Sequence, residues 1–223
     1  MTVSKMDYKK EYKDLYMPGK KPGRITVPEI AFIMVDGAGA PESACYQNAL
    51  SALYALSFGI KMKKMSGDLP EGYFEYVVPP LEGLWWGVSD NREDWQWTSM
   101  IRQPEFVTPA LYEAVLLESR EKKPEIDFEG VRFQTFDEGD CVQIMHVGPY
   151  ADEGRSFDAL AAFMETEGLS RRPGWEQKHH EIYLSDPRRA KPERLKTVLR
   201  IPVEHTNNAE KSKNRLFRIV CIS

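Results

Sequence analysis

The chain has 223 residues, enough to bury a substantial core in one domain of two halves or in two small domains. Its 30 lysines and arginines and 34 aspartates and glutamates give a formal net charge of -4. The basic residues form no stripe with interleaved aromatic residues, which argues against nucleic-acid binding.

Cysteine spacing and hydropathy point to a cytoplasmic protein. Cys45, Cys141 and Cys221 lie far apart without a CxxC or metal-ligand spacing, as is typical of reduced thiols. No charged and apolar leader opens the sequence, and no apolar run approaches the roughly 20 residues of a membrane span. We therefore expect a soluble protein that does not enter a membrane.

The first half of the chain predicts an arm, a strand, a helix and two further strands. Residues 1–24 are rich in lysine, tyrosine, glycine and proline, and we expect them to pack on the surface as an arm. A strand is predicted over residues 25–35, with Pro28 near its beginning. The Glu42-Ser43 pair predicts an N-cap, and apolar residues then recur at helical spacing as far as Ile60. Strands are predicted at residues 73–78 and 84–88.

The second half begins after an insertion, residues 89–123. Thr108 predicts the N-cap of a helix there, with Pro109 at its first position, and Pro124 ends it. Beyond the insertion, the pattern predicts strands at 131–136 and 141–147, a helix at 155–167 with one buried stripe, and strands near 180–184 and 196–203. A mostly polar run, 204–215, precedes an apolar end, 216–222, that pairs as an edge strand or stays loose.

One local pattern occurs twice in the chain. Residues 32–42 align without a gap with residues 143–153, and the pairs Ile33/Ile144, Met34/Met145, Gly37/Gly148, Ala40/Ala151 and Glu42/Glu153 coincide. A helix and a strand-like run opening on a glutamate follow each copy. We predict one α+β domain, residues 25–203, with an antiparallel sheet, helices packed on it, and two β-α-β-β repeats (25–88 and 124–203) related by a pseudo-twofold axis. The arm 1–24 and a tail, 204–223, flank this domain, and a ligand cleft is expected between the repeats.

Glu181 and Tyr183 are two residues apart on a predicted strand, so their side chains share a face. If that face lines the cleft, partial burial would raise the pKa of the carboxyl toward the range of a general base and give it a reason to attract cations. The alternative is a solvated glutamate on an exposed sheet face.

Aromatic residues are the second signal. Trp85 and Trp86 are adjacent on a strand and must point to opposite faces, so at most one of them is core. Trp95 and Trp97 share a face if the insertion is extended there. These rings either form a cage over the cleft or pack as ordinary core.

Three other kinds of site are not supported. His179 and His180 stand beside Glu181, but adjacent strand residues diverge, and we predict no metal site. Cys45 and Cys141 are interpreted as buried structural thiols. The Gly37-Ala38-Gly39-Ala40 turn lacks the third glycine and the lysine of a phosphate-binding loop.

Two groups of motifs resemble the GyrI-like small-molecule-binding family, within the SOUL-type fold. The first group is His146-Val147-Gly148-Pro149-Tyr150 with residues 181–187 and 196–203, and the similarity covers roughly 25–203. The second combines the lysine-rich arm, residues 8–16, with residues 95–104. This second group is similar to a stand-alone subfamily, some of whose members hydrolyse the cyclopropane of cyclopropanoid DNA-alkylating compounds inside an aromatic cage.

The resemblance implies a set of site residues. The central acidic residue of the family corresponds to Glu181, the predicted catalytic base, and the cage is placed by position on Trp86, Trp97, Tyr112, Tyr150 and Tyr183. It implies binding of planar hydrophobic xenobiotics, with ring opening by water and no metal or organic cofactor.

The resemblance leaves several readings of the function open. Regulators of the family carry a helix-turn-helix, which this sequence does not supply. A non-catalytic sequestering protein and a protein that binds a partner such as a topoisomerase stay open as alternatives. Haem binding is weaker, because no isolated histidine stands at a cleft position. The oligomeric state is not predicted.

Overall fold

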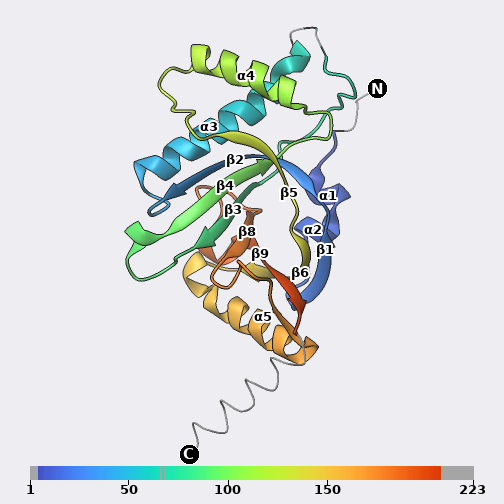
Figure 1. Ribbon diagram of the computed structural model, residues 1–223, viewed down its shortest axis with the longest axis vertical. Helices are drawn as coiled ribbons and strands as arrows, with labels where there is room; N and C mark the ends of the chain where they lie inside the picture. The colour runs from blue at the N-terminus through green and yellow to red at the C-terminus, as the bar shows by residue number, and fades with distance from the viewer. Residues whose placement is uncertain (1–4, 66, 68, 207–223) are drawn as a thin grey trace, which may run out of the picture.

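An antiparallel sheet forms the centre of the protein, whose computed structural model describes residues 5–65, 67 and 69–206 (Figure 1). Eight strands run in the order β1-β6-β9-β8-β3-β4-β2-β5, and β7 pairs with β9 at the side. The strands are β1 (Gly23–Val27), β2 (Ile30–Ala38), β3 (Leu81–Trp86), β4 (Gln96–Arg102), β5 (Arg132–Phe136), β6 (Gly139–Val147), β7 (Leu169–Arg171), β8 (His179–Tyr183) and β9 (Lys196–His205).

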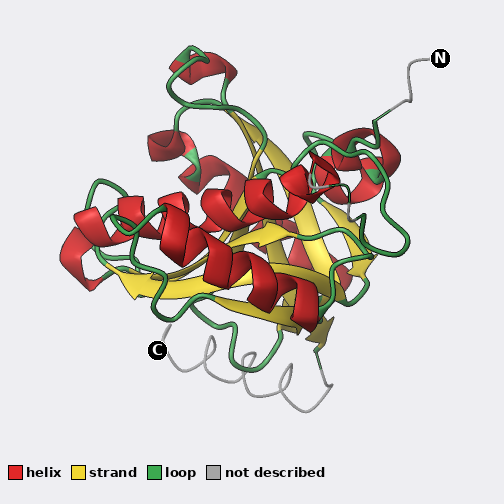
Figure 2. Cartoon of the chain, turned by 90° about the horizontal axis from the view of Figure 1, so that it is seen from above, coloured by secondary structure: helices red, strands yellow, loops and turns green. Residues whose placement is uncertain are grey.

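The described helices are α1 (Tyr8–Glu11), α2 (Lys13–Tyr16), α3 (Ala44–Met62), α4 (Pro109–Lys122) and α5 (Gly154–Glu167), with short 3-10 turns η1 (Lys63–Met65), η2 (Arg92–Asp94), η3 (Tyr150–Asp152) and η4 (Pro192–Arg194). Helices α3 and α5 pack on this sheet, and α4 packs on α3 (Figure 2). The α+β class with an antiparallel sheet is therefore confirmed. Both predicted caps are also confirmed, since Ser43 accepts from the Tyr46 amide and Thr108 from the Leu111 amide.

Two units of the chain have the same order of elements. One unit is β2-α3-β3-β4 and the other is β6-α5-β8-β9, with the short strand β7 added after α5. In the sheet the central strands β3 and β8 of the two units pair with each other. In Figure 1, α3 and α4 lie at one end of the molecule and α5 at the other. The pseudo-twofold axis between the units stays a prediction.

Three predicted elements differ from the structure. The single strand at residues 25–35 is wrong: β1 pairs with β6 while β2 pairs with β4 and β5, and the break falls at Pro28, which has no amide hydrogen for a ladder. Residues 73–78 form no strand beyond one bridge between Met6 and Tyr76. Strand β4 lies inside the segment assigned to the insertion.

Strand register defines the face that α3 and α5 cover. Cross-strand partners share a face, and one row of partners runs Ile144, Leu199, Glu181, Gly83, Ser99 and Val35. Ile144 and Leu199 belong to a buried cluster with Leu160 and Met164 of α5. At the other end of the row, Tyr46 of α3 packs edge-on against Trp97 of β4, with ring centroids 5.0 Å apart. Glu181 and Gly83 therefore lie in the middle of this helical face, between α3 and α5.

The opposite face of the sheet is covered by the N-terminal arm. Tyr8, Leu15 and Tyr16 are all buried and belong to the main hydrophobic core, so the arm contributes to the core as well as to the surface. The apolar end at residues 216–222 and Cys221 lie outside the described residues. Among the described helices, none has the length and apolar character to cross a bilayer.

Candidate functional site

Glu181 occupies the centre of the helical face and is only 9% exposed. Its Oε1 lies 2.8 Å from Nε2 of His179, which shares its face of β8. The ring of His179 packs edge-on against Phe157 of α5, at 4.8 Å between centroids. This histidine can therefore hold the carboxylate in one orientation, because its own ring is held by α5.

Aromatic side chains surround this carboxylate. Trp85 donates its indole N–H to the hydroxyl of Tyr183 at 2.7 Å, and Tyr46 packs on the Trp85 ring at 5.7 Å. Tyr150 packs edge-on against Tyr183 at 6.0 Å and is 41% exposed, so it marks the side of the site that faces solvent. We call Tyr46, Trp85, Tyr150, Glu153, Glu181 and Tyr183 the central site.

Gly83 makes the contact between Trp85 and Tyr183 possible. A Cβ atom at this position would lie 2.8 Å from the indole nitrogen of Trp85 and 3.4 Å from the hydroxyl of Tyr183. Only glycine leaves room for the two side chains to meet above the strand. The local sequence of β3 thus positions an aromatic pair beside Glu181.

Glu153 is a site residue that the sequence reasoning missed. It is 8% exposed, and its Oε1 has no hydrogen-bond partner among the described residues. Burial and the nearby Glu181 carboxylate raise the pKa of Glu153 to about 9. At neutral pH it is therefore a neutral carboxylic acid beside a carboxylate, since two like charges in a buried site cannot both be retained without a large cost.

The tyrosines of the central site are also strongly perturbed. Burial raises the pKa of Tyr46 to about 12, and burial together with Glu181 and Glu153 raises that of Tyr150 to about 12. The pKa of Tyr183 is raised well above its ordinary value by burial and by Glu181. All three hydroxyls therefore keep their protons at neutral pH.

The structure brings some of the predicted cage residues together and separates others. Tyr150 and Tyr183 contact each other beside Glu181, and the fully buried Trp97 contacts the central site through Tyr46. Trp86 points to the opposite face, where its ring lies 4.2 Å from Nζ of Lys178. Tyr112 stacks on Phe133 and donates to the carbonyl of Val131, away from Glu181.

Trp86 and Tyr112 therefore do not line the central site, and Trp85 occupies the place assigned to Trp86. The alternation of β3 decides this, because Gly83 pairs with Glu181 and Trp85 is two residues further on the same face. The sequence established that Trp85 and Trp86 diverge, but only the register with β8 shows which of them faces Glu181.

The indole N–H groups of the tryptophans on β3, on β4 and at Trp95 already have acceptors. Trp85 donates to Tyr183, Trp86 to Gln96, Trp95 to the carbonyl of Ser89 and Trp97 to that of Gly39. A ligand must therefore find its hydrogen-bond donors elsewhere or displace one of these bonds.

The histidine pair diverges as expected from strand geometry. His179 contacts Glu181 on the helical face, whereas His180 contacts Glu138 on the other face. In the part of the chain that the structure describes, no three His, Cys, Asp or Glu side chains are arranged to hold a metal ion. Cys141 is buried as predicted, but Cys45 is exposed at the start of α3, so its assignment as a buried thiol is wrong.

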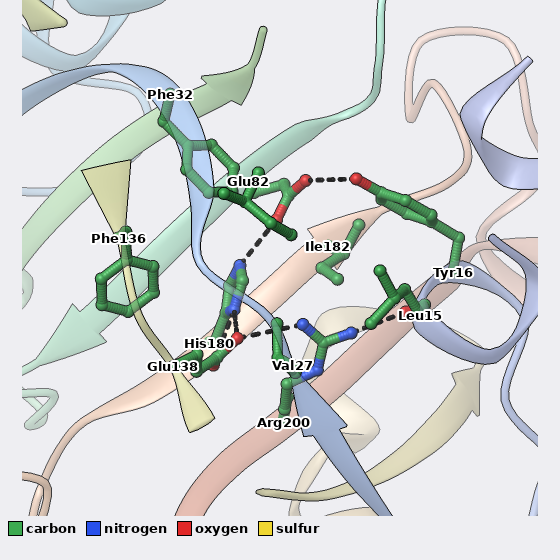
Figure 3. Close-up of a pocket in the computed structure, with 11 residues that line it drawn as sticks. Leu15, Tyr16, Val27, Phe32, Glu82, Phe136, Glu138, His180, Ile182 and Arg200 are labelled. Atoms are coloured by element: carbon green, nitrogen blue, oxygen red, sulfur yellow. Dashed lines mark hydrogen bonds and ion pairs between the residues drawn. The ribbon is translucent and has the colours of Figure 1, made fainter. Parts of the chain in front are cut away.

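A buried charge network lies on the arm face of the sheet (Figure 3), where His180 and Glu82 are the strand neighbours of Glu181 and Gly83. His180 stands between two carboxylates, with Nδ1 2.9 Å from Glu138 and Nε2 3.0 Å from Glu82. Arg200 pairs with Glu138 at 3.0 Å and donates to the Leu15 carbonyl of the arm at 2.6 Å. Tyr16 donates to Glu82 at 3.3 Å.

The network is ionised over a wide pH range. Burial alone would lower the pKa of His180, but Glu138 and Glu82 outweigh it and raise that pKa to about 9. Burial would likewise raise the pKa of Glu138, but His180 and Arg200 outweigh it and lower that pKa to about 2. Two positive and two negative groups thus balance in the interior, where an unpaired charge would be very costly.

Two cavities of the described chain lie away from Glu181. A cavity of about 10 Å³, roughly the volume that one water molecule requires, adjoins the charge network. A wide groove of about 880 Å³ runs between the arm and residues 73–75, with Tyr12, Tyr73 and Phe74 in its lining.

Comparisons with known proteins agree with this fold. The family described as the GyrI-like small molecule binding domain matches residues 22–204. The structure of a hydrolase from Listeria innocua is 49% identical, covers 90% of this chain and 100% of its own, and has a TM-score of 0.86. A second hydrolase structure from that organism is 51% identical with the same coverage and a TM-score of 0.84.

A more distant likeness shows the fold alone. The C-terminal domain of EcmrR is 13% identical and has a TM-score of 0.54, covering 83% of this chain and 98% of its own. None of the curated proteins compared with the chain matches it.

Proposed function

Because the chain belongs to the GyrI-like small molecule binding domain family, we propose that it binds flat hydrophobic molecules at the central site and opens the strained ring of cyclopropanoid electrophiles with water. The observation that carries this proposal is the position of Glu181, a 9% exposed carboxylate enclosed by tyrosines and Trp85. The proposed reaction uses water and protein side chains alone.

The rings of the central site supply the binding energy. Tyr150 is half-open to solvent and lies against Tyr183, so a planar ligand can enter on this side and stack on the exposed aromatic faces. Aromatic contacts add about 0.5–1.5 kcal/mol each beyond the burial of apolar area. The ligand would then lie over Glu181 and Glu153.

Glu181 supplies the base. His179 and Tyr183 both contact its carboxylate and orient it, and in the proposed reaction this carboxylate accepts a proton from a bound water. The water oxygen attacks the unsubstituted cyclopropane carbon, and the C–C bond breaks toward the ring of the dienone. The electron pair of that bond moves to the dienone oxygen, which becomes a phenolate and then takes up a proton. The sum of these steps is the addition of one water molecule.

The hydrolase structures from Listeria innocua support a hydrolytic reaction for this chain, because the identity of 49–51% extends over 90% of it. Sequestration without turnover is the alternative, and the same aromatic site would serve it. The two functions differ in one measurable property, since a sequestering protein binds one equivalent of ligand and releases no product.

Turnover of a spirocyclopropyl dienone tests the proposal. We expect catalytic ring opening by the parent, slowed roughly 10²- to 10⁴-fold by Glu181→Gln, because a positioned base contributes that much. Binding of an inert planar ligand should change little in this variant, and Glu204→Gln, at an exposed position on β9, serves as the control. Equal rates for Glu181→Gln and the parent would exclude this role, and stoichiometric uptake without product would favour sequestration.

A further inference from the structure

We propose that Glu153 enters ligand binding as a neutral carboxylic acid that donates a hydrogen bond to a carbonyl oxygen, so that the site selects flat, uncharged molecules with a ring-conjugated ketone. This inference rests on the proposed function, because it assumes that the ligand lies over the central site. It assigns Glu153 a role distinct from that of Glu181.

The carboxyl of Glu153 has unused hydrogen-bonding capacity in a buried place. Its residue is 8% exposed, Oε1 is unpartnered among the described residues, and the side chain caps no amide of α5 although it precedes that helix. A buried polar atom without a partner costs about 1–3 kcal/mol, and a ligand that supplies the partner removes this cost.

The aligned residue of the first unit shows that burial is specific to Glu153. Glu42 occupies the corresponding place before α3, but its side chain is 70% exposed and is paired with Arg92 at 2.8 Å. The same residue type at the same position of the pattern is thus a solvated ion in one unit and a buried acid in the other. Glu42 therefore provides a matched control.

The other groups of the site favour the neutral form of Glu153 and leave its carboxyl available to bond a ligand. Glu181 and His179 of β8 form a pair, and the indole N–H of Trp85 is donated to Tyr183. The titratable groups that interact with Glu153 are Glu181 of β8 and Tyr150 of η3. Beyond them, His179 and Tyr183 of β8 and Tyr46 of α3 lie around Glu181. The Glu181 carboxylate disfavours ionisation of Glu153. In its neutral form, the Glu153 carboxyl can donate a hydrogen bond.

Paired probes test the assignment. Affinities of 9-fluorenone and fluorene, which differ in the carbonyl group, are measured at pH 7 for the parent, Glu153→Ala, Glu153→Gln and Glu42→Gln. We expect Glu153→Ala to weaken 9-fluorenone roughly 3- to 10-fold, the value of one hydrogen bond, and to leave fluorene unchanged. Glu153→Gln keeps a neutral donor and should retain the preference for 9-fluorenone, as should Glu42→Gln.

The pH dependence of that preference is the second readout. In the parent, the affinity ratio of 9-fluorenone to fluorene should fall as pH rises through about 9, because Glu153 then ionises. Glu153→Gln should keep its ratio over the same range. The ratio cancels alkaline effects common to both ligands, including those of the buried His180.

The experiment distinguishes failure of the Glu153 assignment from failure of the proposed function. A ratio unchanged in Glu153→Ala, or the same pH course in the parent and Glu153→Gln, overturns the assignment of Glu153 and leaves the proposed function intact. If neither probe binds to the folded parent, both proposals fail. Circular dichroism of each variant establishes that it is folded before the affinities are compared.

Discussion

At the scale of the residue, one of the two carboxyls of the central site could be predicted from the sequence and the other could not. Glu181 could be proposed because Tyr183 shares its face of a strand and the family motif includes it. Glu153 coincides with Glu42 in the alignment of the two halves, but nothing local shows that one is buried and the other paired with Arg92. Burial of this kind depends on tertiary packing.

Gly83 is the residue whose substitution should disturb the central site most directly. A Cβ at this position would lie 2.8 Å from the Trp85 indole nitrogen, so Gly83→Ala should separate Trp85 from Tyr183 and lower the free energy of unfolding by about 1–3 kcal/mol. The loss is measured by urea denaturation, together with the affinity for 9-fluorenone.

Gly23→Ala in β1 is the control, because a Cβ there would meet nothing within 4 Å. We expect its stability to stay within about 0.5 kcal/mol of the parent. A Gly83→Ala protein as stable as Gly23→Ala, with unchanged affinity, would contradict the close packing described for this pair.

At the scale of the element, the arm and the central strands are joined by the buried charge network. Its members come from four places in the sequence, Glu82, Glu138, His180 and Arg200, and the arm adds Tyr16. The apolar periodicity that predicted α3, α4 and α5 carries no information about such a network. The same limit applies to residues 73–78, where a strand-like composition forms only a bridge to Met6.

Glu138 is the member that holds both cations, so its charge should be essential to the network. Glu138→Gln leaves His180 and Arg200 buried with one carboxylate between them. We expect a loss of about 3–5 kcal/mol in the free energy of unfolding, the usual cost of breaking a buried pair from one side.

Glu204→Gln, at an exposed position of β9, should change stability by less than about 0.5 kcal/mol. Urea denaturation of both variants measures the difference. Equal stabilities of Glu138→Gln and Glu204→Gln would show that the network contributes nothing.

At the scale of the whole molecule, the sheet separates two chemically different faces. The helical face holds one carboxylate and one neutral acid among aromatic rings, and the arm face holds a balanced set of buried charges. The sequence predicted the α+β class because helical and strand periods are clear along the chain. It could not predict this division, because the division depends on which strands become neighbours.

This division predicts how stability varies with pH. His180 has its pKa raised from 6.5 to about 9, so its contribution is complete below pH 6.5 and is lost as pH rises through 9. Glu138 has its pKa lowered from 4.5 to about 2, so its contribution is complete above pH 4.5 and is lost as pH falls through 2.

Glu153 adds to the alkaline loss. Its pKa is raised from 4.5 in the unfolded chain to about 9 in the folded protein. Between these two pH values Glu153 ionises more readily in the unfolded chain, so the free energy of unfolding decreases as pH rises. The contributions of Glu138 and His180 are both complete between pH 4.5 and 6.5. Because Glu153 destabilises the protein as pH rises through this range, the free energy of unfolding should be highest near its lower limit. It should fall by a few kcal/mol toward pH 9.

Urea denaturation across this range checks the profile. Glu153→Gln should flatten the part of the decline that Glu153 causes and keep the part due to His180. A profile that rises from pH 5 to pH 9 would contradict the signs given for both groups.

Binding of a flat molecule at the central site is tested most directly by a crystal structure of the protein with 9-fluorenone. We predict the ligand against Tyr150 and Tyr183, with its carbonyl oxygen within hydrogen-bond distance of the Glu153 carboxyl. A ligand found instead in the groove beside Tyr12, Tyr73 and Phe74, or against Trp86 on the opposite face, with the central site empty, would contradict it.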